Sequence, residues 1–232
     1  QHTLSDFYSL YSHDFVRVAC CVPRTRVADA AYNLAETLRL AGQGDKARTA
    51  LMVFPELGLS SYAIEDLLLQ DALLDEVELS VGKVVEASRK LFPVLIVGAP
   101  LRLGGRLYNT AIVIHRGAIL GVVPKTYLPN YREFYEKRHF VSGANVIDRE
   151  ITLAGQTVPF GTDLLFRTTG SIATTWLRSG ASLSLTFMIR PRSSARLTRA
   201  SIAIGLIAAG GRVARCAFSR WVTRPPTSRR RM

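Results

Sequence analysis

Residues 50–62 read ALMVFPELGLSSY and place an apolar run directly before a carboxylate. Residues 50–54 are all apolar, which predicts a buried β-strand. Pro55 ends this run, and the ionisable Glu56 follows it. Ligands of α/β sheets gather at the carboxyl ends of the strands. Glu56 is therefore a candidate for chemistry, and the strand before it is a candidate for the centre of the fold.

The segments around this strand predict an α/β fold. Apolar, β-branched runs predict further strands, and apolar residues at helical spacing predict helices. Arg116-Gly117 divides residues 108–125 into a predicted hairpin, which makes the sheet mixed. The predicted strands are 15–22, 50–56 and 93–100, and the predicted helices are 28–42, ending at Gly42, and 63–91.

The three cysteines, Cys20, Cys21 and Cys216, are a poor disulfide framework and favour a reducing compartment. The first residues are polar and do not resemble a signal peptide. The apolar run at 202–209 is too short to span a bilayer. We therefore expect a cytoplasmic location and no membrane partner.

Charge divides the chain in two near residue 166. Residues 1–163 hold 17 basic and all 18 acidic residues, whereas residues 164–232 hold 13 arginines, no lysine and no acid. This Arg-, Ser- and Ala-rich composition is typical of a GC-rich gene read out of frame. We predict a domain at 1–166 and, at 167–232, a basic tail without a recognisable domain. We interpret this tail as a frameshift product and expect its end to be disordered.

A second ionisable residue, Lys125, also follows an apolar strand and a proline. A glutamate and a lysine that meet at one sheet edge can share acid–base work. They can equally form a structural ion pair, because such pairs produce the same arrangement. Position alone leaves both interpretations open.

The motifs FPEL at 54–57 and VPK at 123–125 resemble the first two catalytic motifs of the nitrilase (carbon–nitrogen hydrolase) superfamily. The longer phrases LSSYAIEDLLLQDALLD, YNTAIVIHRGAILGVVPKTYLPNYREFYEKRHF and VPFGTDLLF resemble the glutaminase domains of bacterial glutamine-dependent NAD synthetases. This resemblance covers about residues 7–166.

The resemblance implies a four-layer αββα sandwich and amide hydrolysis by a Cys–Glu–Lys triad. Glu56 would be the general base and Lys125 would stabilise the oxyanion. Glu133 resembles a second glutamate that orients the triad, and Tyr62 and Tyr131 resemble residues lining the glutamine pocket. Ser61 stands where the family usually has glycine, which indicates a slightly strained turn.

The resemblance also implies partners and cofactors. Glutamine would be the substrate, and family members are homo-oligomers. The glutaminase half needs no cofactor or metal. ATP and Mg²⁺ would belong to a synthetase domain, whose Ser-Gly-Gly type loop is missing from this sequence.

The triad cysteine is missing from the segment where the resemblance would place it. Residues 174–185 hold no cysteine, and Ser179 and Ser182 are poor substitutes for a thiolate. We expect Cys20 and Cys21 to be buried and structural, and nothing places Cys216 near the site. The chain is therefore expected to be a truncated, inactive glutaminase domain with exposed apolar sheet faces and poor solubility.

Two other functions remain open from the sequence. A stand-alone amidase or nitrilase-like hydrolase would need another nucleophile, for which Cys216 is the candidate. A non-catalytic basic binding protein would use the arginines of the tail to attract phosphates. No motif for specific nucleic-acid recognition is present.

Overall fold

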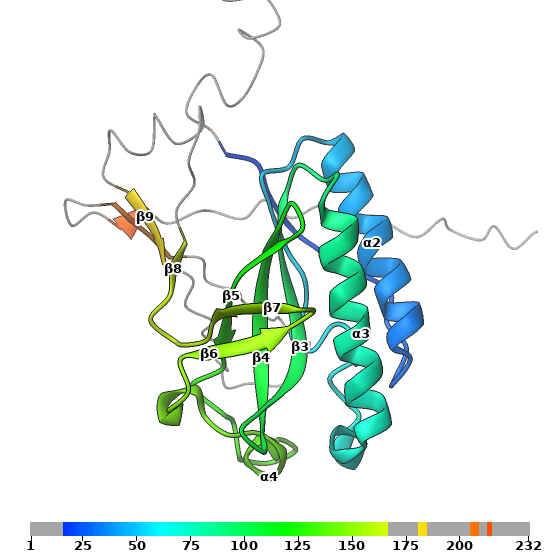
Figure 1. The fold of residues 1–232 in the computed structure, drawn as a ribbon, viewed down its shortest axis with the longest axis vertical. Coiled ribbons are helices and arrows are strands. Elements are labelled where there is room, and N and C mark those ends of the chain that lie inside the picture. The colour runs from blue at the N-terminus through cyan, green and yellow to red at the C-terminus, as the bar shows by residue number, and fades with distance from the viewer. Residues whose placement is uncertain (1–15, 167–180, 185–204, 209–212, 215–232) are drawn as a thin grey trace, which may run out of the picture.

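The computed structural model describes residues 16–166, 181–184, 205–208 and 213–214. At its centre is a five-stranded sheet in the order β1-β2-β3-β4-β5 (Figure 1). Strands β1 to β3 are parallel, and β4 and β5 each run antiparallel to the preceding strand, so the predicted α/β class and mixed sheet are confirmed. The strands are β1 (Val18–Cys20), β2 (Leu51–Val53), β3 (Val94–Leu103), β4 (Arg106–His115) and β5 (Ala118–Pro124).

Two helices, α2 (Ala30–Lys46) and α3 (Asp71–Ser88), lie side by side over one face of this sheet (Figure 1). Asp29 caps α2 by accepting a hydrogen bond from the Tyr32 N–H at 2.9 Å. The predicted helix end at Gly42 is wrong, because α2 continues for four more residues. Gly44 has a packing role within it, since a Cβ there would collide with the side chain of Met52 on β2.

Residues 63–91, predicted to be helical, form two separate elements, the 3₁₀ turn η2 (Glu65–Leu69) and α3. Extended backbone at Gln70 separates them. The predicted hairpin is confirmed, and Arg116 and Gly117 both adopt positive φ, as a two-residue type I′ turn requires.

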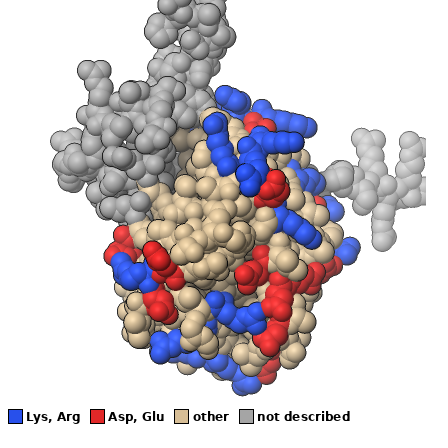
Figure 2. Space-filling model, in the orientation of Figure 1, with Lys and Arg blue, Asp and Glu red and all other residues tan. Residues whose placement is uncertain are grey.

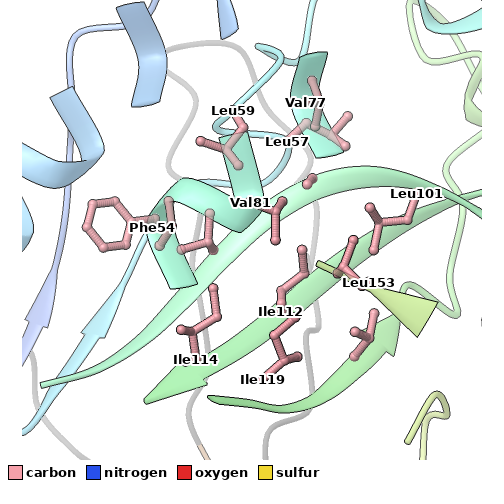
Figure 3. Close-up of a cluster of buried hydrophobic side chains, with 14 of the residues drawn as sticks. Phe54, Leu57, Leu59, Val77, Val81, Leu101, Ile112, Ile114, Ile119 and Leu153 are labelled. Atoms are coloured by element: carbon pink, nitrogen blue, oxygen red, sulfur yellow. The ribbon is translucent and has the colours of Figure 1, made fainter. Parts of the chain in front are cut away.

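The core lies between the helices and the sheet (Figure 3). Val77 and Val81, one helical turn apart on α3, have no exposed surface. They face the sheet, where Ile112 and Ile114 of β4 are fully buried as well. Alternate residues of β4 thus point to the helices, as the period of a strand requires.

A hairpin of β6 (Glu150–Leu153) and β7 (Gln156–Pro159) closes the core beside β5 (Figure 1). The Gln156 side chain holds it there, because its Oε1 accepts from the Ile119 N–H and its Nε2 donates to the Gly117 carbonyl, both at 3.0 Å. Ile151 and Val158 are buried under this hairpin.

The other face of the sheet carries a second buried cluster of Leu51, Val53, Ile96, Ala111 and Val113, against which Phe166 packs. The expectation that apolar sheet faces are exposed is wrong for these residues, since Val53 and Ile96 are each 1% exposed. A second, antiparallel sheet has the order β11-β10-β9-β8. Its strands are β8 (Leu165–Phe166), β9 (Ala181–Ser184), β10 (Gly205–Ala208) and β11 (Val213–Ala214).

The surface of the described part bears charges of both signs (Figure 2). Within the residues described, no helix is long and apolar enough to cross a membrane. Apart from the residues of β9, β10 and β11, the predicted tail lies outside the described residues, and so do its end, which was predicted to be disordered, and the candidate Cys216.

Replacing Ile112 by alanine tests whether the layer between α3 and β4 is the stabilising core. We expect Ile112→Ala to lower the free energy of unfolding by about 2–5 kcal/mol, because it leaves a cavity. Leu79→Ala is the control, since Leu79 lies on α3 but is 67% exposed, and it should cost less than about 0.5 kcal/mol. Urea unfolding measures both, and equal losses would contradict this packing.

Candidate active site

Glu56 and Lys125 meet at one edge of the sheet. Strands β2 and β5 run in the same direction, because β4 is antiparallel to both β3 and β5. Their carboxyl ends therefore lie at the same edge. Lys125 Nζ is 2.6 Å from Glu56 Oε1, and the lysine side chain is only 8% exposed. The structure thus brings together the two charges that the sequence placed at strand ends.

Glu56 reaches β4 and β5 because its backbone crosses over β3 at Gly98. A Cβ at Gly98 would lie 2.4 Å from the Pro55 carbonyl oxygen and 2.6 Å from the Leu57 nitrogen, closer than real Cβ atoms approach, and 3.0 Å from the Glu56 Cα. The Leu59 N–H donates to the Gly98 carbonyl at 3.3 Å and holds the crossing in place. Leu57 adopts φ +51° in this turn. A glycine on β3 is therefore a condition for the position of Glu56.

Asn109 on β4 binds both residues of this pair. Its Nδ2 donates to Glu56 Oε1 at 2.5 Å, and its backbone carbonyl accepts from the Lys125 N–H at 2.8 Å. Asn109 was not among the predicted site residues, although it lies in the YNTA phrase that resembles the family. Glu56 and Lys125 were found as charges that directly follow strands. Asn109 is neutral and lies within a strand, so this signal could not identify it.

The second carboxylate of the site is Glu136, whereas Glu133 was predicted from the sequence. Lys125 Nζ is 2.7 Å from Glu136 Oε1, and the Glu136 side chain is 5% exposed. Glu133 is exposed. The two differ because residues 131–135 form an exposed turn, after which the short helix α4 (Glu136–His139) begins with Glu136 facing inward.

Surface contacts hold α4 against η2. The Arg138 guanidinium contacts both oxygens of the Asp66 carboxylate, at 2.9 and 3.0 Å, and His139 Nε2 lies 3.0 Å from Asp66 Oδ1. These partners lower the pKa of Asp66, the hydrogen bond from His139 most of all. Helix α4, which begins with Glu136, is thereby held against η2, the element that follows Tyr62.

The site holds two carboxylates and one ammonium in a largely buried place. Tyr62 donates its hydroxyl to Glu136 Oε1 at 2.5 Å. Burial raises the pKa of Glu136, against the lowering effect of Lys125 and Tyr62. Burial and the hydrogen bond to Glu136 also raise the pKa of Tyr62, so the phenol keeps its proton. Among the residues described, no group hydrogen-bonds to the buried Glu136 Oε2.

The two tyrosines predicted to line a pocket differ in the structure. Tyr62 contacts the charged cluster, whereas Tyr131 is 45% exposed and packs its ring 5.8 Å from that of Phe134. A pocket role for either stays a prediction. Ser61, just before Tyr62, adopts φ +75°. The tight turn expected at this residue is therefore confirmed, with a serine in a conformation that favours glycine.

The family follows from the extent of a sequence match around this cluster. The model of the family described as Carbon-nitrogen hydrolase matches residues 17–162, which is more than half of the chain. This chain belongs to the carbon-nitrogen hydrolase family. The match contains every residue of the charged cluster, so the cluster lies inside the family domain.

Several relatives of this carbon-nitrogen hydrolase domain share one description. The glutamine-dependent NAD(+) synthetase of Mycobacterium tuberculosis is 56% identical over 164 residues, covering 69% of this chain and 24% of that protein. The glutamine-dependent NAD(+) synthetase of Aquifex aeolicus is 39% identical over 104 residues, covering 45% of this chain and 18% of that protein. The chain thus spans at most about a quarter of the length of these curated relatives.

A solved structure agrees with this family fold. The crystal structure of a glutamine-dependent NAD(+) synthetase from Cytophaga hutchinsonii matches with a TM-score of 0.59 at 22% identity. The match covers 66% of this chain and 26% of that one. At this identity the likeness supports the fold alone.

The two described cysteines are poor candidates for a nucleophile of this carbon-nitrogen hydrolase domain. Cys20 ends β1 and is exposed, which corrects the expectation that it is buried. Cys21 is half-buried, and burial raises its thiol pKa to about 12. A thiol with so high a pKa holds almost no thiolate at neutral pH. Strand β1 also lies at the opposite side of the sheet from β4 and β5.

Metal ligation has no support among the described residues, which contain no group of three or more His, Cys, Asp or Glu side chains able to hold an ion. The chemistry that the cluster offers is acid–base and electrostatic. A carboxylate can take a proton, and an adjacent ammonium can stabilise developing negative charge.

Gly98→Ala tests the crossing of Glu56 over β3. We expect the free energy of unfolding to fall by about 1–3 kcal/mol, because the added methyl group collides with backbone that cannot move cheaply. Gly42→Ala is the matched control, since nothing lies within 4 Å of its Cβ and α2 should gain about 0.5–1 kcal/mol. Urea unfolding of both variants measures the difference, and a stable Gly98→Ala protein would contradict the close crossing.

The raised pKa of Glu136 predicts a pH dependence. The native protein keeps the Glu136 proton to higher pH than the unfolded chain, whose glutamate pKa is about 4.3. The stability that this proton contributes is therefore complete below about pH 4.3 and is lost as pH rises through the native pKa.

We therefore expect the stability of wild type, measured relative to Glu136→Gln in urea unfolding, to fall as pH rises above about 4.3. Glu133→Gln is the control, because Glu133 is exposed and should show no such trend. A difference between wild type and Glu136→Gln that stays constant with pH would show that the Glu136 pKa is unchanged on folding.

Proposed function

We propose that this chain is a glutaminase-type domain that binds the side-chain amide of glutamine at Glu56, Lys125 and Glu136. One observation carries the proposal: Lys125 lies between two carboxylates at the carboxyl edge of a carbon-nitrogen hydrolase sheet. The 56% identity to proteins described as glutamine-dependent NAD(+) synthetases supports glutamine as the ligand.

The cluster suits the chemistry of amide hydrolysis. Glu56 would take the proton of an attacking group as general base. Lys125 would stabilise the negative oxygen of the tetrahedral intermediate, and Glu136 would hold Lys125 and Tyr62 in place. In a complete triad, a cysteine thiolate attacks the amide carbon, ammonia leaves, and water then hydrolyses the thioester to glutamate.

We propose further that this chain binds glutamine without hydrolysing it. The whole sequence contains three cysteines, and none lies in residues 174–185, where the resemblance to the family would place the nucleophile. Cys20, at the end of β1, and Cys21, directly after it, do not replace it, because burial raises the pKa values of their thiols. Without a thiolate, neither the thioester nor ammonia forms.

A binding and turnover experiment on the full chain tests this proposal. Titration calorimetry should detect glutamine binding, and glutamate should bind at least about tenfold more weakly, because its carboxylate would meet Glu56 and Glu136. Ammonia release should not exceed the buffer blank. Lys125→Met should abolish binding, whereas Lys137→Met, an exposed residue of α4, should not.

The outcomes separate the two parts of the proposal. Wild-type protein that is folded but does not bind glutamine contradicts the ligand. Ammonia release that a thiol-alkylating reagent abolishes contradicts the missing nucleophile, and labelling of Cys216 would then favour the stand-alone amidase.

We propose that the basic tail is a frameshift product, on the evidence of its composition after residue 166. Sequencing the gene across codons 160–175 and translating all three frames tests this. A second frame that continues the family resemblance would support the proposal. A single open frame would contradict it and would favour a selected role for the arginines. Oligomerisation, cytoplasmic location and dependence on ATP and Mg²⁺ are proposals that belong to a whole synthetase.

A further inference from the structure

We infer that Asn109 is the positioning residue of this site, and that it makes Oε2 the basic oxygen of Glu56. Asn109 is 3% exposed and lies on β4, between the strands that lead to Glu56 and Lys125. Its side chain binds Glu56 and its backbone carbonyl binds the N–H of Lys125. It is thus bonded to both members of the ion pair.

The two oxygens of Glu56 have different surroundings. Oε1 accepts two hydrogen bonds, from Asn109 Nδ2 at 2.5 Å and from Lys125 Nζ at 2.6 Å. Within the described part of the chain, no donor hydrogen-bonds to Oε2, and the Glu56 side chain remains 24% exposed. Because two donors already occupy Oε1, the oxygen free to take a proton is Oε2.

The amide of Asn109 suits this role because it is neutral. Two carboxylates already share the one ammonium of Lys125, and an aspartate at position 109 would add a third negative charge. An asparagine donates a hydrogen bond to Glu56 without changing the net charge of the site. Hydrogen bonds to charged groups are also among the stronger ones in proteins.

The strand itself explains why Asn109 is fixed. Asn109 pairs with Pro100 of β3 within a long antiparallel ladder, and its carbonyl accepts from the Lys125 N–H on the other side, so its backbone is held from both sides. The next residue, Thr110, is equally buried but donates its hydroxyl to the Ala99 carbonyl. Neighbouring residues of a strand point to opposite faces, so Asn109 is directed at Glu56 and Thr110 is not.

Reactivity of the Lys125 amine tests the inference without any substrate. Without Asn109, Glu56 is held by Lys125 alone, and the ion pair should open more often. Acetylation by an N-hydroxysuccinimide ester, followed by mass spectrometry, should show Lys125 labelled about tenfold faster in Asn109→Leu than in wild type. Lys137, exposed on α4, is the internal standard.

Thr110→Val is the matched control, because it removes one buried hydrogen bond from the same strand without touching Glu56. It should leave the Lys125 labelling rate unchanged. Equal acceleration in both variants would mean general loosening of the strand and would overturn the inference. If Asn109→Leu does not fold, Asn109→Ser, which is too short to reach Glu56, takes its place.

A double-mutant cycle decides whether Asn109 acts through Glu56. In a Glu56→Ala background, Asn109→Leu should no longer change the labelling rate of Lys125, because the residue that it positions is gone. An undiminished effect would overturn the inference. The assignment of Oε2 as the base rests on the proposed function, but labelling is independent of glutamine, so failure of glutamine binding would leave the positioning role standing.

Discussion

The buried ammonium of Lys125 is the constraint on which this edge of the structure depends. Taking a charge out of water costs several kcal/mol unless partners compensate for it. Glu56 and Glu136 supply that compensation at 2.6 and 2.7 Å, and they come from segments far apart in the sequence. The fold must therefore bring the ends of β2 and β5 and the start of α4 close together.

The approach of Glu56 shows how the fold meets this constraint. The chain after β2 passes over β3, which is possible only because Gly98 has no side chain. On β4, Asn109 donates a hydrogen bond to the Glu56 carboxylate. Lys125, directly after β5, donates a second one. The core between α3 and the sheet keeps these strands in register, so packing far from the charges determines where the charges meet.

The charged cluster of this carbon-nitrogen hydrolase domain has a structural basis that does not depend on a nucleophile. Lys125 needs its two carboxylates whether or not chemistry takes place, because an unpaired buried charge destabilises the folded state. Glu56, Asn109 and Glu136 therefore have structural reasons to remain arranged as they are. Ion pairing and acid–base chemistry, the two interpretations left open by the sequence, require the same geometry.

The sequence by itself determined the α/β class, the mixed sheet, the Arg116-Gly117 hairpin and the positions of Glu56 and Lys125 directly after strands. These features follow from local signals: apolar periodicity, turn residues, and charges placed directly after strands. Only the tertiary structure decided that Glu136 rather than Glu133 binds Lys125, that Asn109 holds Glu56, and that α2 continues past Gly42. The reason is physical, because which face of a short helix turns inward, and which glycine lies against a neighbouring strand, depend on contacts between segments distant in the sequence.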